Sequence, residues 1–235
     1  MKNSRVYALL LSALAVGALS GCVRFKPVDD PTRFYVLTAQ APREPLPDVA
    51  RLTNLVFVSA IEMPAYLDNP RIAVRREEHR IDYSELHQWA EPLRQSISRG
   101  LRDNLAAILG DEHVYPLSRP RPVGDLIQVQ VSLSRFELTP DQGARLVADW
   151  RLIRTKSGEV LAAQHTEEQC VYPNNARDFT PAVAALTQVL ADLSRDIASI
   201  LVQVESNRAA RRGEYTTVIE TAGGAISTDR SGRNP

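Results

Sequence analysis

The strongest constraint on the fold is a strict alternation of apolar and polar residues in the second half of the chain. Apolar side chains occupy every second position from 127 to 133, and glutamine or serine stands between them. Successive side chains of a strand point to opposite faces, so this pattern predicts a strand with one face in the core. A turn at 141–143 and a second alternating run over 146–152 predict a hairpin. Another turn at Ser157-Gly158 leads into a third strand over 159–172, which completes a meander.

Two helices are predicted to cover this sheet, because each carries one apolar stripe. The first begins at Glu91, with Pro92 at its first position, and ends at Gly110. Its stripe consists of Leu93, Ile97, Leu101, Leu105 and Ile108. The second begins at Thr180-Pro181, and its stripe consists of Val183, Leu186, Leu190, Leu193, Ile197, Ile200 and Val204. We expect this stripe to pack on the sheet rather than in a separate coiled coil, since three heptads are the lower limit for that structure.

The first third of the chain predicts shorter strands over 33–38, 52–61 and 71–76, with a return strand near Ile81. The run over 52–61 is apolar on both faces, which indicates a central position in the sheet. The expected fold class is therefore α+β: a mainly antiparallel sheet with two long helices packed on one face, in a single domain.

The N-terminus has the features of a bacterial lipoprotein signal. Lys2 and Arg5 precede a short apolar run, and Leu19-Ser20-Gly21 leads into Cys22. This pattern predicts cleavage before Cys22 and lipidation of its thiol. More than one acyl chain, such as palmitate, then gives stable anchoring. The alternative is an ordinary secretory signal that is followed by a cysteine. Val23 rather than an aspartate follows Cys22, which favours the outer membrane, with the domain facing the periplasm.

The expected organisation is a signal peptide over 1–21, a lipid-anchored tether over 22–32, a folded domain over 33–206 and a disordered tail over 207–235. Loss of the signal removes two basic residues and leaves the 28 acidic side chains in slight excess. A nucleic-acid partner is disfavoured because nothing supplies a basic field.

No recognisable motif indicates catalysis, a cofactor or a metal site. The four histidines lie in polar stretches at spacings that make no ligand set, so we expect them at the surface: His79, His87, His113 and His165. Cys170 lies in a strand pattern without a local histidine, which favours an inert thiol. We therefore expect no enzyme, because a lipoprotein hydrolase would need a Ser/His/acid site that the sequence does not display.

Two apolar-aromatic segments stand outside the periodic stripes, Met63–Asp68 and Trp89–Leu93. Their side chains Tyr66, Leu67 and Trp89 are hypothesised to form a partner surface, because aromatic side chains often anchor interfaces. The alternative that both segments are loops folded back on the core stays open.

At these segments the sequence resembles the PqiC family, the ABC-type transport auxiliary lipoproteins. The matching pieces are the signal ending at Cys22 and the segments 33–37, 63–75, 89–93, 134–137 and 148–152. The resemblance covers nearly all of residues 19–204 and implies an α+β domain on an outer-membrane lipid anchor, without catalysis.

The resemblance also implies partners and a function. The partners would be an MCE-domain periplasm-spanning protein and the membrane subunits of the same system. Association into a homo-oligomer is also compatible with the resemblance. The function would be lipid transport between membranes that supports outer-membrane integrity. The rival interpretation is a structural envelope lipoprotein that binds peptidoglycan or another envelope protein.

Overall fold

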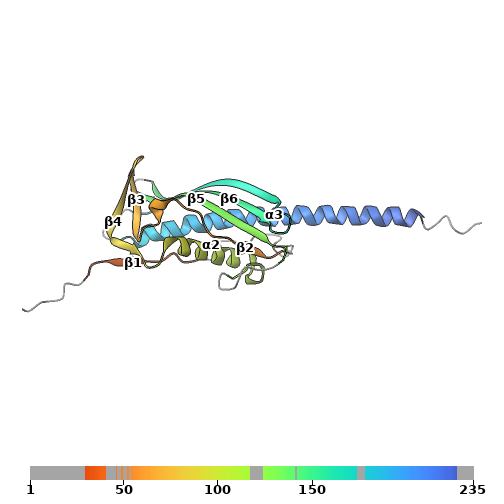
Figure 1. Cartoon of the computed structure of the whole chain (residues 1–235), viewed down its shortest axis with the longest axis horizontal. Helices are drawn as coiled ribbons and strands as arrows, with labels where there is room; N and C mark the ends of the chain where they lie inside the picture. Colours follow the sequence, from red (N-terminus) through yellow and green to blue (C-terminus); the bar gives the residue numbers. More distant parts are fainter. Residues whose placement is uncertain are drawn as a thin grey trace, which may run out of the picture. The chain divides into compact units, whose positions relative to one another are not determined.

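The predicted meander forms the centre of the structure, a computed structural model. It describes residues 30–40, 46, 49, 52, 54–116, 124–140, 142–173 and 178–226, with side chains up to residue 211. The meander strands β5 (Ile127–Thr139), β6 (Gly143–Arg154) and β7 (Val160–Cys170) pair antiparallel in chain order (Figure 1). The alternating apolar side chains of β5 are buried as predicted, up to a register shift between Leu133 and Arg135.

The N-terminal half adds β1 (Arg33–Tyr35), β2 (Val56–Val58), β3 (Arg71–Glu77) and β4 (Arg80–Trp89). The described strands are ordered β1-β4-β3-β5-β6-β7, and β2 pairs with β5 beside this path. The pairs β1–β4, β2–β5 and β3–β5 are parallel, whereas the longer ladders of β3–β4, β5–β6 and β6–β7 are antiparallel. The sheet is therefore mixed but mainly antiparallel, and the α+β prediction is confirmed.

Three strand predictions need correction. The strand expected over 33–38 ends at Tyr35. The predicted central strand over 52–61 is reduced to β2, because only its three residues pair with β5. Since β6 takes one edge of β5, β2 and β3 both use the other edge, at opposite ends of β5. The return strand is longer than expected, because β4 continues to Trp89.

The helices α2 (Leu93–Leu109) and α3 (Thr180–Ile226) cover one face of the sheet, as predicted (Figure 1). They approach each other closely at Gly100, where a Cβ atom would lie 2.9 Å from Leu190 Cδ2. Gly110 ends α2 with a φ of 96°, a conformation that favours glycine. Short 3-10 helices complete the described elements, η2 (Ala65–Leu67) and η3 (Asp111–His113).

The stripe of α3 is buried from Val183 to Ile197, and Leu201 rather than Ile200 takes the next buried place. Leu201 takes the place of Ile200 because a straight α-helix drifts relative to a seven-residue repeat. The helix also runs past residue 206, where we expected it to end, and reaches Ile226. Within the described residues, no helix combines the length and the apolar character needed to cross a membrane.

By its contacts the chain divides into Met1–Pro31 and Thr32–Pro235, and the elements above belong to the second unit. The predicted signal peptide, Cys22 and residues 227–235 lie outside the described residues.

Candidate functional site

The two apolar-aromatic segments singled out from the sequence lie beside each other. The N–H of Trp89, at the end of β4, donates to the carbonyl oxygen of Pro70 over 2.7 Å, just after η2. Arg94 in the first turn of α2 donates to the carbonyl oxygen of Ile61 over 2.7 Å. Its guanidinium also lies 3.9 Å from the carboxylate of Asp68. Both segments are therefore held in place by hydrogen bonds that involve the backbone.

A pocket of about 330 Å³ opens where the segments meet, and we call it the Trp89 pocket. It is lined by Asp68, Asn69, Pro70, Trp89, Glu91, Pro92 and Leu93. Its rim carries the carboxylates of Asp68, which is exposed, and Glu91, which is half-buried. Arg99 donates to Glu91, and this hydrogen bond holds the pKa of Glu91 below its ordinary value. Since Glu91 is paired with Arg99, the arrangement suits a small apolar group with a cation on the side of Asp68.

The hypothesised surface residues are not equally accessible. Leu67 and Trp89 are only 2% and 6% exposed and belong to the hydrophobic core. Their expected place on the surface is corrected, and the alternative of loops folded back on the core describes both side chains. Tyr66 is half-buried and packs against the same core. The carboxylates of Asp68 and Glu91, which sequence reasoning did not single out, are the accessible polar groups of these segments.

Tyr66 is joined to a buried ion pair between strands. Its hydroxyl donates to Glu137 Oε2 over 2.9 Å, and the guanidinium of Arg75 binds the same carboxylate. The side chain of Glu137 is fully buried. Burial and the Glu137 charge raise the pKa of Tyr66 to about 12. We call these three residues the Glu137 cluster.

The Glu137 cluster joins three segments that carry the family resemblance: η2, β3 and the second half of β5. It fixes η2, and with it one wall of the Trp89 pocket, to the sheet. Glu137 and Arg75 are 62 residues apart in sequence. No spacing pattern could have paired them, although both lie in segments quoted for the resemblance.

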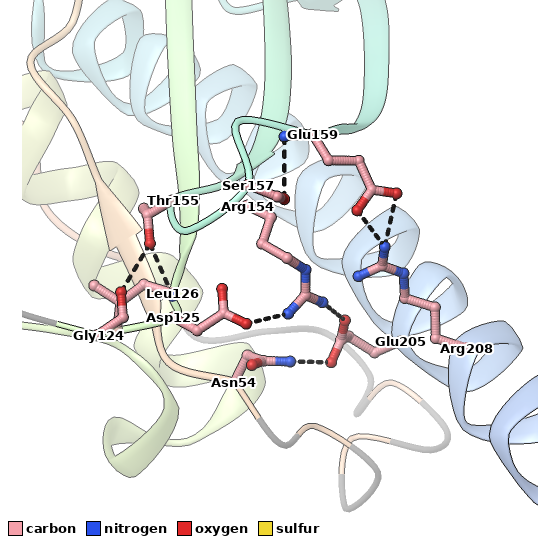
Figure 2. Close-up of polar contacts among 10 residues, drawn as sticks. All are labelled: Asn54, Gly124, Asp125, Leu126, Arg154, Thr155, Ser157, Glu159, Glu205 and Arg208. Atoms are coloured by element: carbon pink, nitrogen blue, oxygen red, sulfur yellow. Dashed lines mark hydrogen bonds and ion pairs between the residues drawn. The ribbon is translucent and has the colours of Figure 1, made fainter.

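A second buried network holds α3 at the other end of the meander (Figure 2). Arg154 donates to Asp125 over 2.8 Å and to Glu205 over 3.4 Å, and Asn54 donates to Glu205 over 2.5 Å. Arg208 then binds Glu159 over 2.6 Å. These contacts fix α3 to the end of β6 and the start of β7, so they are structural in character.

The histidines and Cys170 are distributed over separate places. His87 is buried, so its expected place on the surface is corrected. A hydrogen bond of 2.8 Å joins its Nδ1 to the Tyr35 hydroxyl, and its ring stacks on Phe179. Burial and Arg33 lower the pKa of His87. Cys170 is partly exposed. Among the described residues, no three His, Cys, Asp or Glu side chains gather as a metal site would require.

Comparison with known proteins decides the family. The model of the ABC-type transport auxiliary lipoprotein component family matches residues 35–198. The chain belongs to this family. The match includes the Trp89 pocket and the Glu137 cluster, and it confirms the resemblance seen in the sequence. It ends inside α3, before Glu205 and Arg208.

Two solved structures share the fold. A Xanthomonas campestris protein of the DUF330 family is 17% identical with a TM-score of 0.64, and the match covers 76% of this chain and 99% of that chain. A second crystal structure, described only as an uncharacterized protein, is 19% identical with a TM-score of 0.58 and covers 71% and 96%. Identities this low support the fold alone. No curated protein matches the chain.

Membership of this family establishes how the protein is anchored and in what kind of system it works. The chain is a lipoprotein and is therefore a membrane-anchored protein of the cell envelope. As an auxiliary component of a transport system, it works with other components of that system.

Proposed function

We propose that this auxiliary lipoprotein is a non-enzymatic subunit of an MCE/Pqi-type intermembrane lipid-transport system. It is anchored to the outer membrane through Cys22, faces the periplasm and docks the MCE-domain protein that spans the periplasm. The observation that carries the proposal is the pocket built from two family-like segments, with Asp68 and Glu91 at its rim.

The tether limits what the domain can reach. About ten residues separate Cys22 from Thr32, where the folded unit begins. Fully extended, this tether spans at most about 35 Å. The domain therefore stays close to the membrane that holds its anchor, and the partner has to bridge the remaining distance.

The size of the Trp89 pocket favours docking over lipid carriage. A volume of about 330 Å³ lies at the lower limit for small-molecule pockets. Such a pocket can take one or two side chains of a partner but not a two-chain phospholipid. Glu91 is already paired with Arg99, whereas the exposed carboxylate of Asp68 lies 3.9 Å from Arg94 and is accessible to a partner. Asp68 would favour a partner segment that carries lysine or arginine beside a small apolar residue.

Membrane fractionation with intact-mass analysis tests the anchor. We expect the wild-type chain to be cleaved before Cys22, to carry a diacylglyceryl mass and to stay with outer membranes at high salt. Cys22→Ser should leave the precursor unprocessed or the domain unanchored. A mature Cys22→Ser protein that still sediments with outer membranes at high salt would show that the anchor is elsewhere.

The structural alternative is separated by a binding assay. An envelope lipoprotein without a transport role would bind purified peptidoglycan or another envelope protein and would not bind the MCE-domain protein. The proposal predicts binding to the MCE-domain protein and no binding to peptidoglycan.

A further inference from the structure

Three large apolar side chains are exposed at one edge of the sheet. Phe34, Val36 and Leu86 are 63%, 46% and 45% exposed. Single exposed apolar residues are common on soluble proteins, but a local group of them marks an interaction site. The group lies on and beside β1, the outermost strand at this end of the described sheet.

The strand register places these side chains on one face. Phe34 pairs with Gln88 of β4. Leu86 and Gln88 flank the buried His87, and Phe34 and Val36 flank Tyr35, which is bonded to His87. The three exposed apolar side chains therefore lie on the side opposite to the Tyr35–His87 pair. We call them the β1 patch.

The other face of the same strands is already occupied. Tyr35 and His87 are joined by a hydrogen bond of 2.8 Å, and His87 stacks on Phe179 just before α3. Leu37 is buried in the core. The strands are therefore well packed on the helix side, and the exposure of the β1 patch is not a sign of a loosely placed segment.

The cationic side chain of Arg71 on β3 lies next to the β1 patch, across a third strand. Arg71 of β3 pairs with Gln88 from the opposite side, and it lines an open depression of about 650 Å³ together with Arg76 and Leu86. Among the described residues, no carboxylate forms an ion pair with Arg71, whose guanidinium lies 5.5 Å from the ring centroid of Tyr83.

The acidic side chains of this depression are Asp82 and Glu85. Asp82 lies within 3.4 Å of Arg76 and 3.6 Å of Arg80, so its charge is compensated locally. For Glu85 the described residues show no ion pair, so the depression carries one uncompensated carboxylate besides the cation of Arg71. The guanidinium of Arg71 lies beside the β1 patch and can bind an anionic group from outside.

We propose that the β1 patch and Arg71 rest on the phospholipid bilayer that holds the lipid anchor. Apolar side chains next to an arginine are typical of surfaces that lie in the headgroup region, where the apolar groups reach the acyl boundary and the guanidinium binds phosphate. The inference rests on the proposed lipidation of Cys22.

The position of the patch along the chain selects the bilayer as its occupant. The tether from Cys22 leads directly into β1, so along the chain the β1 patch is the exposed apolar group that comes first after the anchor. Three side chains alone would bind a bilayer weakly. Tethering raises their effective concentration at the membrane, so a weak contact suffices to orient the domain. The C-terminal part of α3 leaves the sheet at the end away from β1 (Figure 1).

Tryptophan fluorescence tests the contact in the full lipidated chain. Phe34→Trp is reconstituted in vesicles of phosphatidylethanolamine and phosphatidylglycerol, with and without bromine on the acyl chains. The two native tryptophans, Trp89 and Trp150, are buried and provide a constant background. The matched control is Val160→Trp, which is 52% exposed at the start of β7.

We expect Phe34→Trp to shift to shorter wavelength on vesicles and to be quenched by bromine at least about twofold more than Val160→Trp, because its ring reaches the acyl boundary. Equal quenching of both variants on vesicles that retain the protein would overturn the membrane contact and leave the anchor intact. A blue shift without bromine quenching would overturn it too, because another protein surface would then cover the patch. Failure of the wild-type chain to stay with vesicles would refute the anchor and this inference together.

Discussion

The N–H of Trp89 lies 2.7 Å from the carbonyl oxygen of Pro70 and joins the end of β4 to the loop after η2. This bond joins two residues that line the Trp89 pocket, while the indole packs into the core. The proposed docking surface and the core therefore share Trp89 and Leu93, of which Trp89 has the larger side chain. The stability of the fold and the shape of the pocket should respond together when Trp89 changes.

Trp89→Ala should lower the free energy of unfolding by about 3–5 kcal/mol, as expected when a large buried aromatic side chain leaves a cavity. Asp68→Ala, at the exposed rim of the same pocket, should change it by less than about 0.5 kcal/mol. Urea denaturation of both variants provides the measurement. A small loss for Trp89→Ala would show that the indole lies at the surface, as the sequence first suggested.

Arg75→Ala should cost about 3–5 kcal/mol, because it leaves the buried carboxylate of Glu137 without its cation. The comparison is Arg145→Ala, which breaks the more exposed pair with Glu167 and should cost less than about 1 kcal/mol. Chemical denaturation at neutral pH measures both. Equal costs for the two variants would mean that the buried Arg75–Glu137 pair contributes no more to stability than the more exposed Arg145–Glu167 pair.

The meander and the two helices could be predicted because local periodicity encodes them. The alternation over 127–133 fixes which face of β5 is buried, and the stripe of α3 fixes its contact side. The Glu137 cluster could not be predicted in this way. The register shift after Leu133 breaks the alternation, so the burial of Glu137 depends on backbone geometry that no residue pattern reports.

The same reason explains the misplacement of Trp89. Irregular pairing between β3 and β4 removes strict alternation from β4, so the burial of its last residue is not visible in the sequence. The extent of α3 was also underestimated. Its apolar stripe weakens near residue 206, where the sheet no longer covers it, but the helix itself continues.

Leu193→Ala should cost about 2–5 kcal/mol through lost burial and a cavity, since this α3 side chain is fully buried. Gln203→Ala on the exposed side of the helix should change the free energy of unfolding by less than about 0.5 kcal/mol. Urea denaturation compares the two. A loss below about 1 kcal/mol for Leu193→Ala is the range of surface positions and would exclude α3 from the core.

Stability should fall as the pH rises between about 4.5 and about 7 because of Glu168. Burial, followed by the charges of Asp196 and Asp192 on α3, raises its pKa from 4.5 to about 7. The folded state therefore holds this proton more tightly than the unfolded state, and the advantage is lost as the carboxyl ionises.

Glu168→Gln should remove this part of the pH dependence and should be more stable than the wild type at pH 8. Thermal unfolding from pH 4.5 to pH 8 measures the pH dependence of stability. The control is Glu167→Gln at the exposed neighbouring position. If Glu168→Gln keeps the wild-type profile, the pH dependence arises elsewhere.

The most direct test of the central claim is the affinity of the full lipidated chain for the purified MCE-domain protein of the same envelope system. We expect the wild-type chain to bind, and we expect Asp68→Arg to weaken binding by about tenfold or more while the fold stays intact, because an interfacial charge reversal costs more than 1.4 kcal/mol. Asp111→Arg, which changes an exposed carboxylate in η3 away from the Trp89 pocket, should bind like the wild type. Absence of binding by the folded, anchored wild-type chain would contradict the docking function, and equal binding by Asp68→Arg would contradict the role of the Trp89 pocket.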